Sequence, residues 1–358
     1  MKKILPFVIP DVTCYPATSE ACGILFADPA IHDWMYNNFI QLFEVDASHA
    51  VDYYDFAIEN NPFLSYSEID YTFVMKKWDS IISFIVDALD DNYYLRFFVN
   101  TAKMELYDFG YFHHDLIVYG YDMEEKILYI ADHFKRGKFS MDKCSFDDFL
   151  HALDTYDPDQ FGKLPAFLRS VQMVKIETDF LRLRYSMYTP QEMDALLTFN
   201  IDRIKESLQD YLLCRPTRGW FSRGVLMDEK HSAGHRWGLE CYDVLSDLVK
   251  NVFHKKKNNL VTRQSFFAEY NHKCMMASRV KLLEEKGYLE KGSIWHGSFD
   301  ELGKKIYRIM LLYFRVSAKK AYTSEEESQI LSQLSEVRRQ DKQRTEELLQ
   351  ALWQKGGI

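Results

Sequence analysis

The sequence predicts an α+β protein in which N-terminal helices and an antiparallel sheet precede a purely helical region. Apolar runs of strand length are concentrated between residues 93 and 176. After residue 176 the apolar residues recur with helical spacing instead. The 358 residues are enough for two domains. We therefore expect a first domain at residues 1–175 and an all-helical domain at residues 176–358.

The first part of the chain should alternate extended and helical segments, because short apolar runs give way to apolar residues at helical intervals. An extended segment is expected at residues 4–10, helices at 19–26, 30–43 and 69–89, and strands at 93–99 and 104–107. Pro29 suits the first turn of the second helix, since proline lacks the N–H that this turn leaves unused.

Two strands joined by a turn form the most informative stretch of the chain. The run Leu116–Tyr119 suits a buried strand, Gly120-Tyr121-Asp122 begins a reversal, and Ile127–Ala131 suits a second buried strand. A third short strand should start at 137–139, a helix capped by Ser145 should cover 142–153, and a strand should cover 171–176.

The second half carries clear helix signals. Thr189-Pro190-Gln191-Glu192 combines a capping threonine, a proline at the first helical position and a capping-box glutamate, so a helix should run from there to about residue 213. Residues 215–224 should form a loop. Further helices are expected at 232–253, 263–286, 298–321 and 324–354. The charged middle of the last helix fits either a homodimer seam or a solvated brace over the first domain.

A histidine opens the first of the two central strands and an aspartate closes the second. Antiparallel pairing places the start of one strand beside the end of the next, so His114 and Asp132 should meet across the ladder. An imidazole oriented by a carboxylate is the base half of a nucleophilic triad. His113 is an alternative, and strand alternation sends its ring to the opposite face.

Two cysteines are candidates for the missing nucleophile. Cys14 precedes an amphipathic helix by a few residues, and a thiolate near a helix N-terminus that pairs with a protonated histidine has a lowered pKa. Cys22 lies inside the same helix, where a cysteine usually packs as a small hydrophobic residue. We favour Cys14 and expect its sulfur to approach the second ring nitrogen of His114.

Cysteine usage and hydropathy exclude several classes of protein. The six cysteines lack the short spacing of a zinc site, so we expect no metal and no cofactor of the protein's own. Pro6 and Pro10 interrupt a very short N-terminal apolar run, which predicts no signal peptide, no disulfides and a cytoplasmic protein. No run of about eighteen apolar residues predicts a membrane span.

The net charge of −9 conceals an asymmetry. Residues 1–150 carry 11 Lys+Arg and 25 Asp+Glu of the chain's 44 and 53, which leaves 33 and 28 for the rest. An acidic first domain should concentrate a cationic amine, and a basic second domain should attract an acidic carrier protein or a phosphate. Only one short basic run, Lys255-Lys256-Lys257, is present, so nucleic-acid binding is not expected.

The order cysteine, histidine, aspartate, with the last two on adjacent strands, resembles the papain-like cysteine peptidase superfamily. The closer likeness is to bacteriocin-processing cysteine peptidases and to the N-terminal domain family of butirosin biosynthesis protein H. The likeness covers about residues 1–175. It rests on His114-x5-Gly120-Tyr121-Asp122, on Asp132, on Ser145-Phe146-Asp147-Asp148-Phe149 and on the segment Trp34–Leu42. The six-residue step from His114 to Gly120 matches the family, which favours His114 over His113.

The resemblance implies a papain-like domain and an enzyme that transfers an acyl or peptidyl group from a carrier-protein thioester to a small amine in natural-product assembly. Cys14 would carry the acyl group, His114 would move the protons and Asp132 would orient the ring. The phosphopantetheine arm would arrive with the carrier protein, and its phosphate would suit Arg215, Arg218 and Arg223, unless this loop is only a solvent-facing linker. The helical domain would cover the cleft and exclude water.

One departure from the family keeps other functions open. Papain-like enzymes place a glutamine six residues before the nucleophile as an oxyanion donor, and this chain has Val8 before Cys14 and Pro16 before Cys22. Gln41 and Asn100 are substitutes to consider. The alternatives are a cysteine peptidase or thioesterase that uses water, and a non-catalytic binding protein of the same fold.

Overall fold

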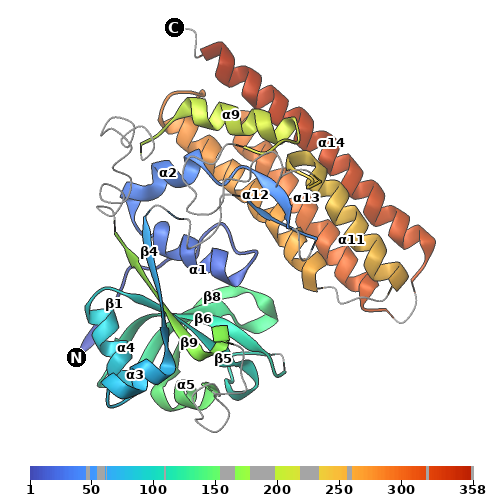
Figure 1. The fold of residues 1–358 in the computed structure, drawn as a ribbon. Coiled ribbons are helices and arrows are strands. Elements are labelled where there is room, and N and C mark those ends of the chain that lie inside the picture. The colour runs from blue at the N-terminus through green and yellow to red at the C-terminus, as the bar shows by residue number, and fades with distance from the viewer. Residues whose placement is uncertain are drawn as a thin grey trace. The chain divides into compact units, whose positions relative to one another are not determined.

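A computed structural model of the chain describes residues 1–45, 49–54, 61, 63–108, 110–153, 166–177, 198–217, 234–255, 260–319 and 322–355. The fold is α+β, with an antiparallel sheet and then a helical C-terminal region, as the sequence predicts (Figure 1). It comprises two compact units that interleave along the chain. The first contains Met1–Pro10, Tyr15–Ala30 and Ala57–Tyr188, and the second contains Asp11–Cys14, Ile31–Phe56 and Thr189–Ile358. This division of the chain differs from the single boundary expected near residue 175, because two N-terminal segments pack with the later helices.

Seven strands form the sheet of the first unit within the described residues. They are β1 (Lys2–Ile4), β4 (Leu64–Asp70), β5 (Tyr94–Asn100), β6 (His113–Asp122), β7 (Ile127–His133), β8 (Phe139–Ser145) and β9 (Ser170–Ile176). Their order is β4-β9-β5-β6-β7-β8, and β1 pairs with the end of β6. Every pairing is antiparallel. The expected pair of buried central strands is confirmed as β6 and β7.

The short first strand fits against β6 because of a glycine. Ile4 pairs with Gly120, and a Cβ atom on Gly120 would lie 2.8 Å from the carbonyl oxygen of Lys3. A side chain at this position would therefore push β1 away from the sheet. The expected strand at 104–107 is wrong, because a 3₁₀ turn, η3 (Thr101–Lys103), ends β5 and residues 104–108 form irregular turns.

The helices of the first unit are α1 (Pro16–Leu25), α3 (Tyr71–Lys77), α4 (Ile81–Asp90) and α5 (Phe146–Ala152), with 3₁₀ turns η4 (Lys135–Gly137) and η6 (Ala166–Arg169). The single helix expected at 69–89 is interrupted. Asp70 caps α3 by accepting from the Thr72 N–H at 2.7 Å, and Ser80 starts α4 through a capping box with Ser83. Two cap signals inside one apolar rhythm thus divide it into two helices.

The 3₁₀ turn η1 (Pro29–Ile31) contains the point where the chain passes from the first unit to the second. The second unit contains α2 (His32–Asn37), β2 (Leu42–Val45), β3 (Ala50–Tyr53), α9 (Ile201–Leu212), η7 (Gly238–Glu240), α11 (Cys241–Lys255), α12 (Leu260–Glu285), α13 (Ile294–Ser317) and α14 (Ser324–Lys355). The helix expected at 30–43 ends early, because Phe39 adopts a left-handed conformation (φ +54°). Residues 42–53 then form a hairpin that packs on α11 and α12. After β9 (Ser170–Ile176), every described element is helical, so the expected helical C-terminal region is confirmed; the hairpin comes from the N-terminal part of the chain. The helix start predicted at Thr189 lies outside the described residues.

A charged network is buried between the helices of the second unit. Lys273 on α12 and Asp341 on α14 are both fully buried, and the Lys273 Nζ atom lies 2.5 Å from Asp341 Oδ2. The same carboxylate oxygen accepts from the hydroxyls of Tyr211 (2.7 Å) and Tyr242 (3.1 Å). A second carboxylate, Glu269, lies 3.7 Å from Lys273. Four helices thus share one buried ion pair.

We expect Gly238→Ala to destabilise the second unit by at least about 2 kcal/mol. Gly238 has φ +52°, and a Cβ atom there would lie 2.1 Å from the backbone oxygen of Tyr211. Both the left-handed backbone conformation and the close contact with α9 make a side chain at residue 238 unfavourable. The urea midpoint should fall markedly, whereas Gly297→Ala, on α13 where nothing lies within 4 Å of the new atom, should preserve it. Equal midpoints for the two variants would contradict this account.

Candidate active site

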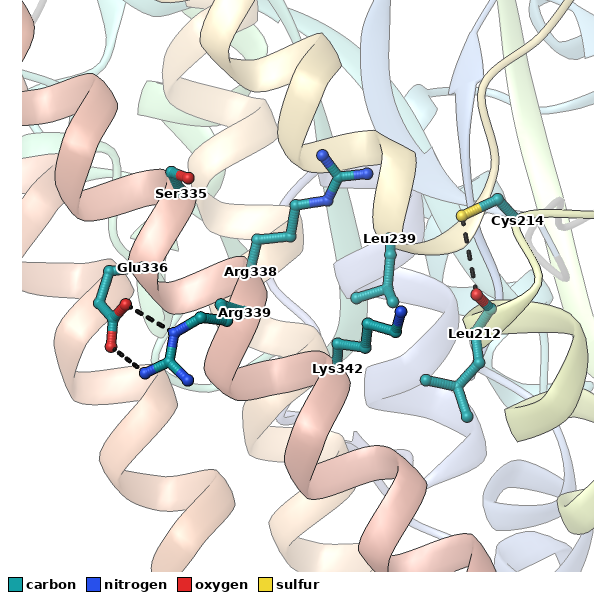
Figure 2. Close-up of a pocket in the computed structure, with 8 residues that line it drawn as sticks. All are labelled: Leu212, Cys214, Leu239, Ser335, Glu336, Arg338, Arg339 and Lys342. Carbon is teal, nitrogen blue, oxygen red and sulfur yellow. Dashed lines mark hydrogen bonds and ion pairs between the residues drawn. The ribbon is translucent and has the colours of Figure 1, made fainter.

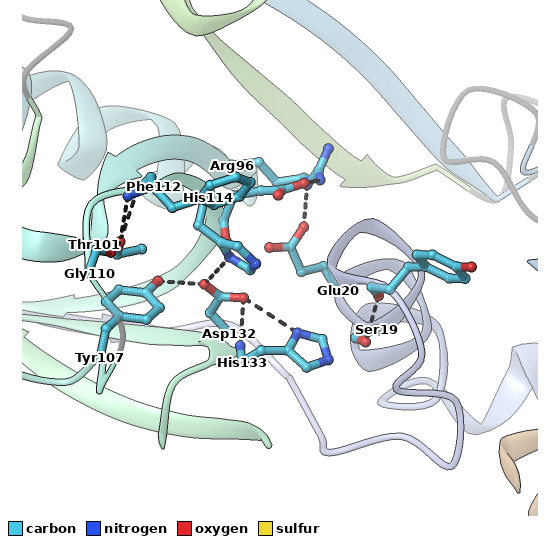
Figure 3. Close-up of polar contacts among 12 residues, drawn as sticks. Ser19, Glu20, Arg96, Thr101, Tyr107, Gly110, Phe112, His114, Asp132 and His133 are labelled. Atoms are coloured by element: carbon cyan, nitrogen blue, oxygen red, sulfur yellow. Dashed lines mark hydrogen bonds and ion pairs between the residues drawn. The ribbon is translucent and has the colours of Figure 1, made fainter. Parts of the chain in front are cut away.

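The predicted contact between His114 and Asp132 is confirmed. Ile117 pairs with Ala131, so His114 and Asp132 lie diagonally across strands β6 and β7 on one face of the sheet. The Nδ1 atom of His114 lies 2.7 Å from Asp132 Oδ2 (Figure 3). It also lies 3.0 Å from the backbone oxygen of Asp115. Both neighbours only accept hydrogen bonds, so Nδ1 carries a proton and Nε2 is the nitrogen that gains or loses one.

Asp132 is fully buried and accepts further hydrogen bonds that fix its orientation. The hydroxyl of Tyr107 donates to Oδ2 at 2.5 Å, and the backbone N–H of His133 donates to Oδ1 at 2.6 Å (Figure 3). Burial alone would raise the pKa of Asp132, but hydrogen bonds from His114 and His133 lower it below its ordinary value. The aspartate is therefore a fixed anion behind the imidazole. Sequence reasoning missed Tyr107 because residues 104–107 resembled a strand.

The surroundings of His114 favour its protonated form. Burial alone would lower the pKa of His114, but the hydrogen bond and the negative charge of Asp132, with a further contribution from Asp115, raise it to about 9. The ring is 14% exposed. An imidazolium at neutral pH cannot take a proton from a serine hydroxyl, but it can stabilise a neighbouring thiolate. This pKa would suit a thiolate as a partner of the ring better than a serine hydroxyl.

A second polar cluster lies near the pair, between α1 and the sheet. The guanidinium of Arg96 forms an ion pair with Glu20 (Figure 3). It forms a second ion pair with Asp115 (2.6 Å) and donates to the side-chain oxygen of Gln172. Arg96 and Glu20 are buried, and burial raises the pKa of Glu20 to about 8 despite the charge of Arg96. An arginine within the apolar run of β5 was the sequence signal for this cluster. It fixes α1 to β5 and β6.

The two candidate nucleophiles belong to different units. Cys22 is fully buried inside α1 in the first unit, as a packing residue would be. Cys14 belongs to the second unit, and its sulfur lies 4.0 Å from Asp52 Oδ1. In the chain, Cys14 immediately precedes Tyr15, the N-cap of α1. The His114–Asp132 pair belongs to the first unit, and the distance from Cys14 to His114 stays a prediction.

The expected oxyanion substitutes have structural roles. Gln41 donates through Nε2 to the backbone oxygen of Arg215 (2.7 Å) and to Thr217 Oγ1 (3.1 Å), so its amide N–H groups hold a loop of the second unit. The Asn100 oxygen accepts from the backbone N–H of Ala102 at 3.0 Å and caps η3. These contacts give no support to either residue as an oxyanion donor.

Of the predicted phosphate-binding arginines, only Arg215 is described, since Arg218 and Arg223 lie outside the described residues. The Arg215 side chain is about half exposed and pairs with Asp210 at 2.5 Å. A cavity of about 430 Å³ in the second unit is lined by other cations, namely Arg338, Arg339 and Lys342 (Figure 2). Arg339 pairs with Glu336 and Arg338 pairs with Asp243, so acidic neighbours already balance much of this charge.

Among the described residues, no group of three or more metal-ligating side chains converges, and no helix is long and apolar enough to cross a membrane. No protein-family model matches the sequence, and no curated protein matches it either. The buried His114–Asp132 pair is thus the observation from which a function must be inferred.

Proposed function

We propose that the chain is a cysteine-dependent acyltransferase of papain-like fold. It would form an amide from a carrier-bound thioester and an amine, with Cys14 as nucleophile, His114 as proton carrier and Asp132 as its orienting anion. The observation that carries the proposal is the 2.7 Å contact between His114 Nδ1 and a fully buried aspartate. It leaves Nε2 for the proton transfers.

The raised pKa of His114 fits both half-reactions of such an enzyme. In the first, the Cys14 thiolate attacks the thioester carbon, the carbon–sulfur bond to the carrier arm breaks, and the imidazolium gives its proton to the leaving thiolate. In the second, the neutral imidazole accepts a proton from the amine as the carbon–nitrogen bond forms and Cys14 leaves as thiolate. The thiolate–imidazolium state is thereby restored, and no ATP or metal is consumed.

The place of Cys14 in the chain supports its assignment over Cys22. Cys14 stands one residue before the N-cap of α1, a ten-residue helix whose N-terminal dipole favours a nearby thiolate. Cys22 is fully buried in that helix. The same proposal includes a carrier protein and a small amine as partners and a cytoplasmic location. It also gives the helical unit the role of limiting access of water to the acyl-enzyme.

We expect intact-protein mass spectrometry to detect a covalent acyl adduct on Cys14 after incubation with an acyl-carrier thioester. Cys14→Ala should eliminate the adduct, whereas Cys22→Ala should retain it. An adduct on Cys22 instead would keep the mechanism and correct the nucleophile. The absence of any cysteine adduct would exclude covalent acyl transfer.

Product analysis with a diamine acceptor then separates transfer from hydrolysis. Amide should form in preference to free acid at saturating diamine, and the apparent affinity for the diamine should weaken with added salt. The acidic excess of residues 1–150 attracts the cation over a distance that salt limits to about 8–10 Å. If free acid dominates at saturating diamine, the chain is better described as a hydrolase.

A further inference from the structure

The segment that carries Cys14 and strand β3 are anchored to the same helix of the second unit. The backbone N–H of Thr13 donates to Asn271 Oδ1 at 2.8 Å, and the backbone N–H of Val51 donates to Ser265 Oγ at 3.0 Å. Ser265 and Asn271 are buried on α12 and lie six residues apart, about 9 Å along its axis. This shared support fixes the spacing between Cys14 and β3.

Asp52, the residue after Val51, brings a carboxylate to the Cys14 thiol. Its Oδ1 atom lies 4.0 Å from Cys14 Sγ and accepts from the backbone N–H of Tyr53 at 2.7 Å. Burial raises the pKa of Asp52 to about 7. In the part of the chain that the structure describes, no lysine, arginine or histidine pairs with this carboxylate, although most other buried acids of the second unit have a basic partner. A partly buried carboxylate with no cation of its own suits a cationic ligand.

We propose that Asp52 binds the ammonium group of the acceptor amine beside Cys14 and accepts one of its protons, so that the chain selects aliphatic primary amines. The inference rests on the proposed acyl transfer at Cys14. In the acyl-enzyme the acyl carbon is bonded directly to Cys14 Sγ, which lies 4.0 Å from Asp52 Oδ1. A substrate nitrogen that binds Asp52 at about 2.8 Å can therefore also lie about 3–3.5 Å from the acyl carbon, which is a suitable distance for attack.

The proton balance of this step is complete. The ammonium gives one proton to Asp52, which later releases it to solvent, and becomes a neutral amine. The nitrogen then bonds to the acyl carbon, the carbon–sulfur bond breaks, and Cys14 leaves as thiolate. The second nitrogen proton passes to the proposed base, His114. Asp52 thus attracts and deprotonates the amine, whereas water carries no positive charge and is not drawn to the carboxylate by charge attraction.

The test compares a charged and an uncharged nucleophile on one acyl-enzyme. The full-length chain is acylated with a propionyl N-acetylcysteamine thioester, and the adduct on Cys14 is monitored by mass spectrometry. It is then challenged at pH 7 with n-propylamine, which is cationic, or with hydroxylamine, which is largely uncharged. Asp52→Asn should lower the rate ratio of n-propylamine to hydroxylamine by roughly tenfold or more. Asp52→Glu should recover part of the ratio, and Asp300→Asn, which removes an exposed carboxylate on α13, should leave it unchanged.

An unchanged ratio in Asp52→Asn, with the Cys14 adduct present, would overturn the role of Asp52 and leave the proposed transferase intact. Failure of the wild-type chain to form the adduct would overturn the proposed function itself, and with it the role of Asp52. A second measurement needs no variant. n-Propylammonium chloride should slow alkylation of Cys14 by iodoacetamide, whereas 1-propanol with matched sodium chloride should not. Equal rates in the two solutions would also contradict an ammonium site beside Cys14.

Discussion

Replacing His114 with alanine should reduce acyl transfer by about 10³- to 10⁴-fold, because the variant loses the group that protonates the leaving thiol and deprotonates the amine. Asp132→Asn should cost at least about 10²-fold, since an amide cannot hold the Nδ1 proton of His114 with a full negative charge. Steady-state rates with an acyl-carrier thioester and a diamine give both values. His113→Ala is the matched control: His113 is the preceding residue on β6, and its variant should stay close to the wild-type rate.

His114→Ala should also change the pH dependence of alkylation at Cys14, whereas His113→Ala should not. The pKa of His114 is raised to about 9, so the imidazolium that stabilises a thiolate predominates at neutral pH and is lost as the pH rises through about 9. Wild-type Cys14 should therefore react with iodoacetamide well below pH 8. His114→Ala should move this reactivity toward the ordinary thiol pKa of about 8.5. If His113→Ala has the larger effect on rate or alkylation, the assignment of the base is wrong.

The largest loss of stability is expected from Asp341→Ala, about 3–5 kcal/mol, because it leaves the buried ammonium of Lys273 without its closest anion. Three donors converge on one oxygen of Asp341, so two tyrosine hydroxyls lose an acceptor at the same time. Glu269 lies farther from Lys273, at 3.7 Å, and burial raises the pKa of Glu269 to about 7, so it compensates only in part. Urea denaturation that follows the helical unit gives the change in the free energy of unfolding.

Two control variants test whether the loss in Asp341→Ala comes from the unpaired buried charge. The double variant Lys273→Met/Asp341→Leu removes both charges of the closest pair and should recover part of the stability, since an apolar pair avoids their desolvation cost. The recovery is partial because Glu269 then loses its basic neighbour. Asp300→Ala breaks the exposed pair between Asp300 and Lys304 on α13 and should change little. A loss in Asp341→Ala no larger than that in Asp300→Ala would show that the network contributes no more than a surface pair.

Local patterns in the sequence were sufficient for the central hairpin and the long helices. Apolar runs and turn residues located β6 and β7, and antiparallel geometry alone brought His114 to Asp132. These patterns were insufficient at residues 69–89, where one continuous apolar spacing contains two helix N-caps. The caps, Asp70 and Ser80, divide the expected helix into the end of β4 and two separate helices. The hairpin of β2 and β3 was missed because its stabilising contacts are with α11 and α12, some two hundred residues away in the chain.

The sequence by itself determined the α+β class, the two central strands and the pairing of His114 with Asp132, because strand periodicity and antiparallel register are local properties of the chain. Only the tertiary structure assigned residues 11–14 and 31–56 to the helical unit, placed Asp52 beside Cys14 and brought Tyr107 to Asp132. Those contacts depend on side chains that meet through packing between distant segments. No periodicity in the chain encodes which carboxylate will pair with a basic residue of a distant segment.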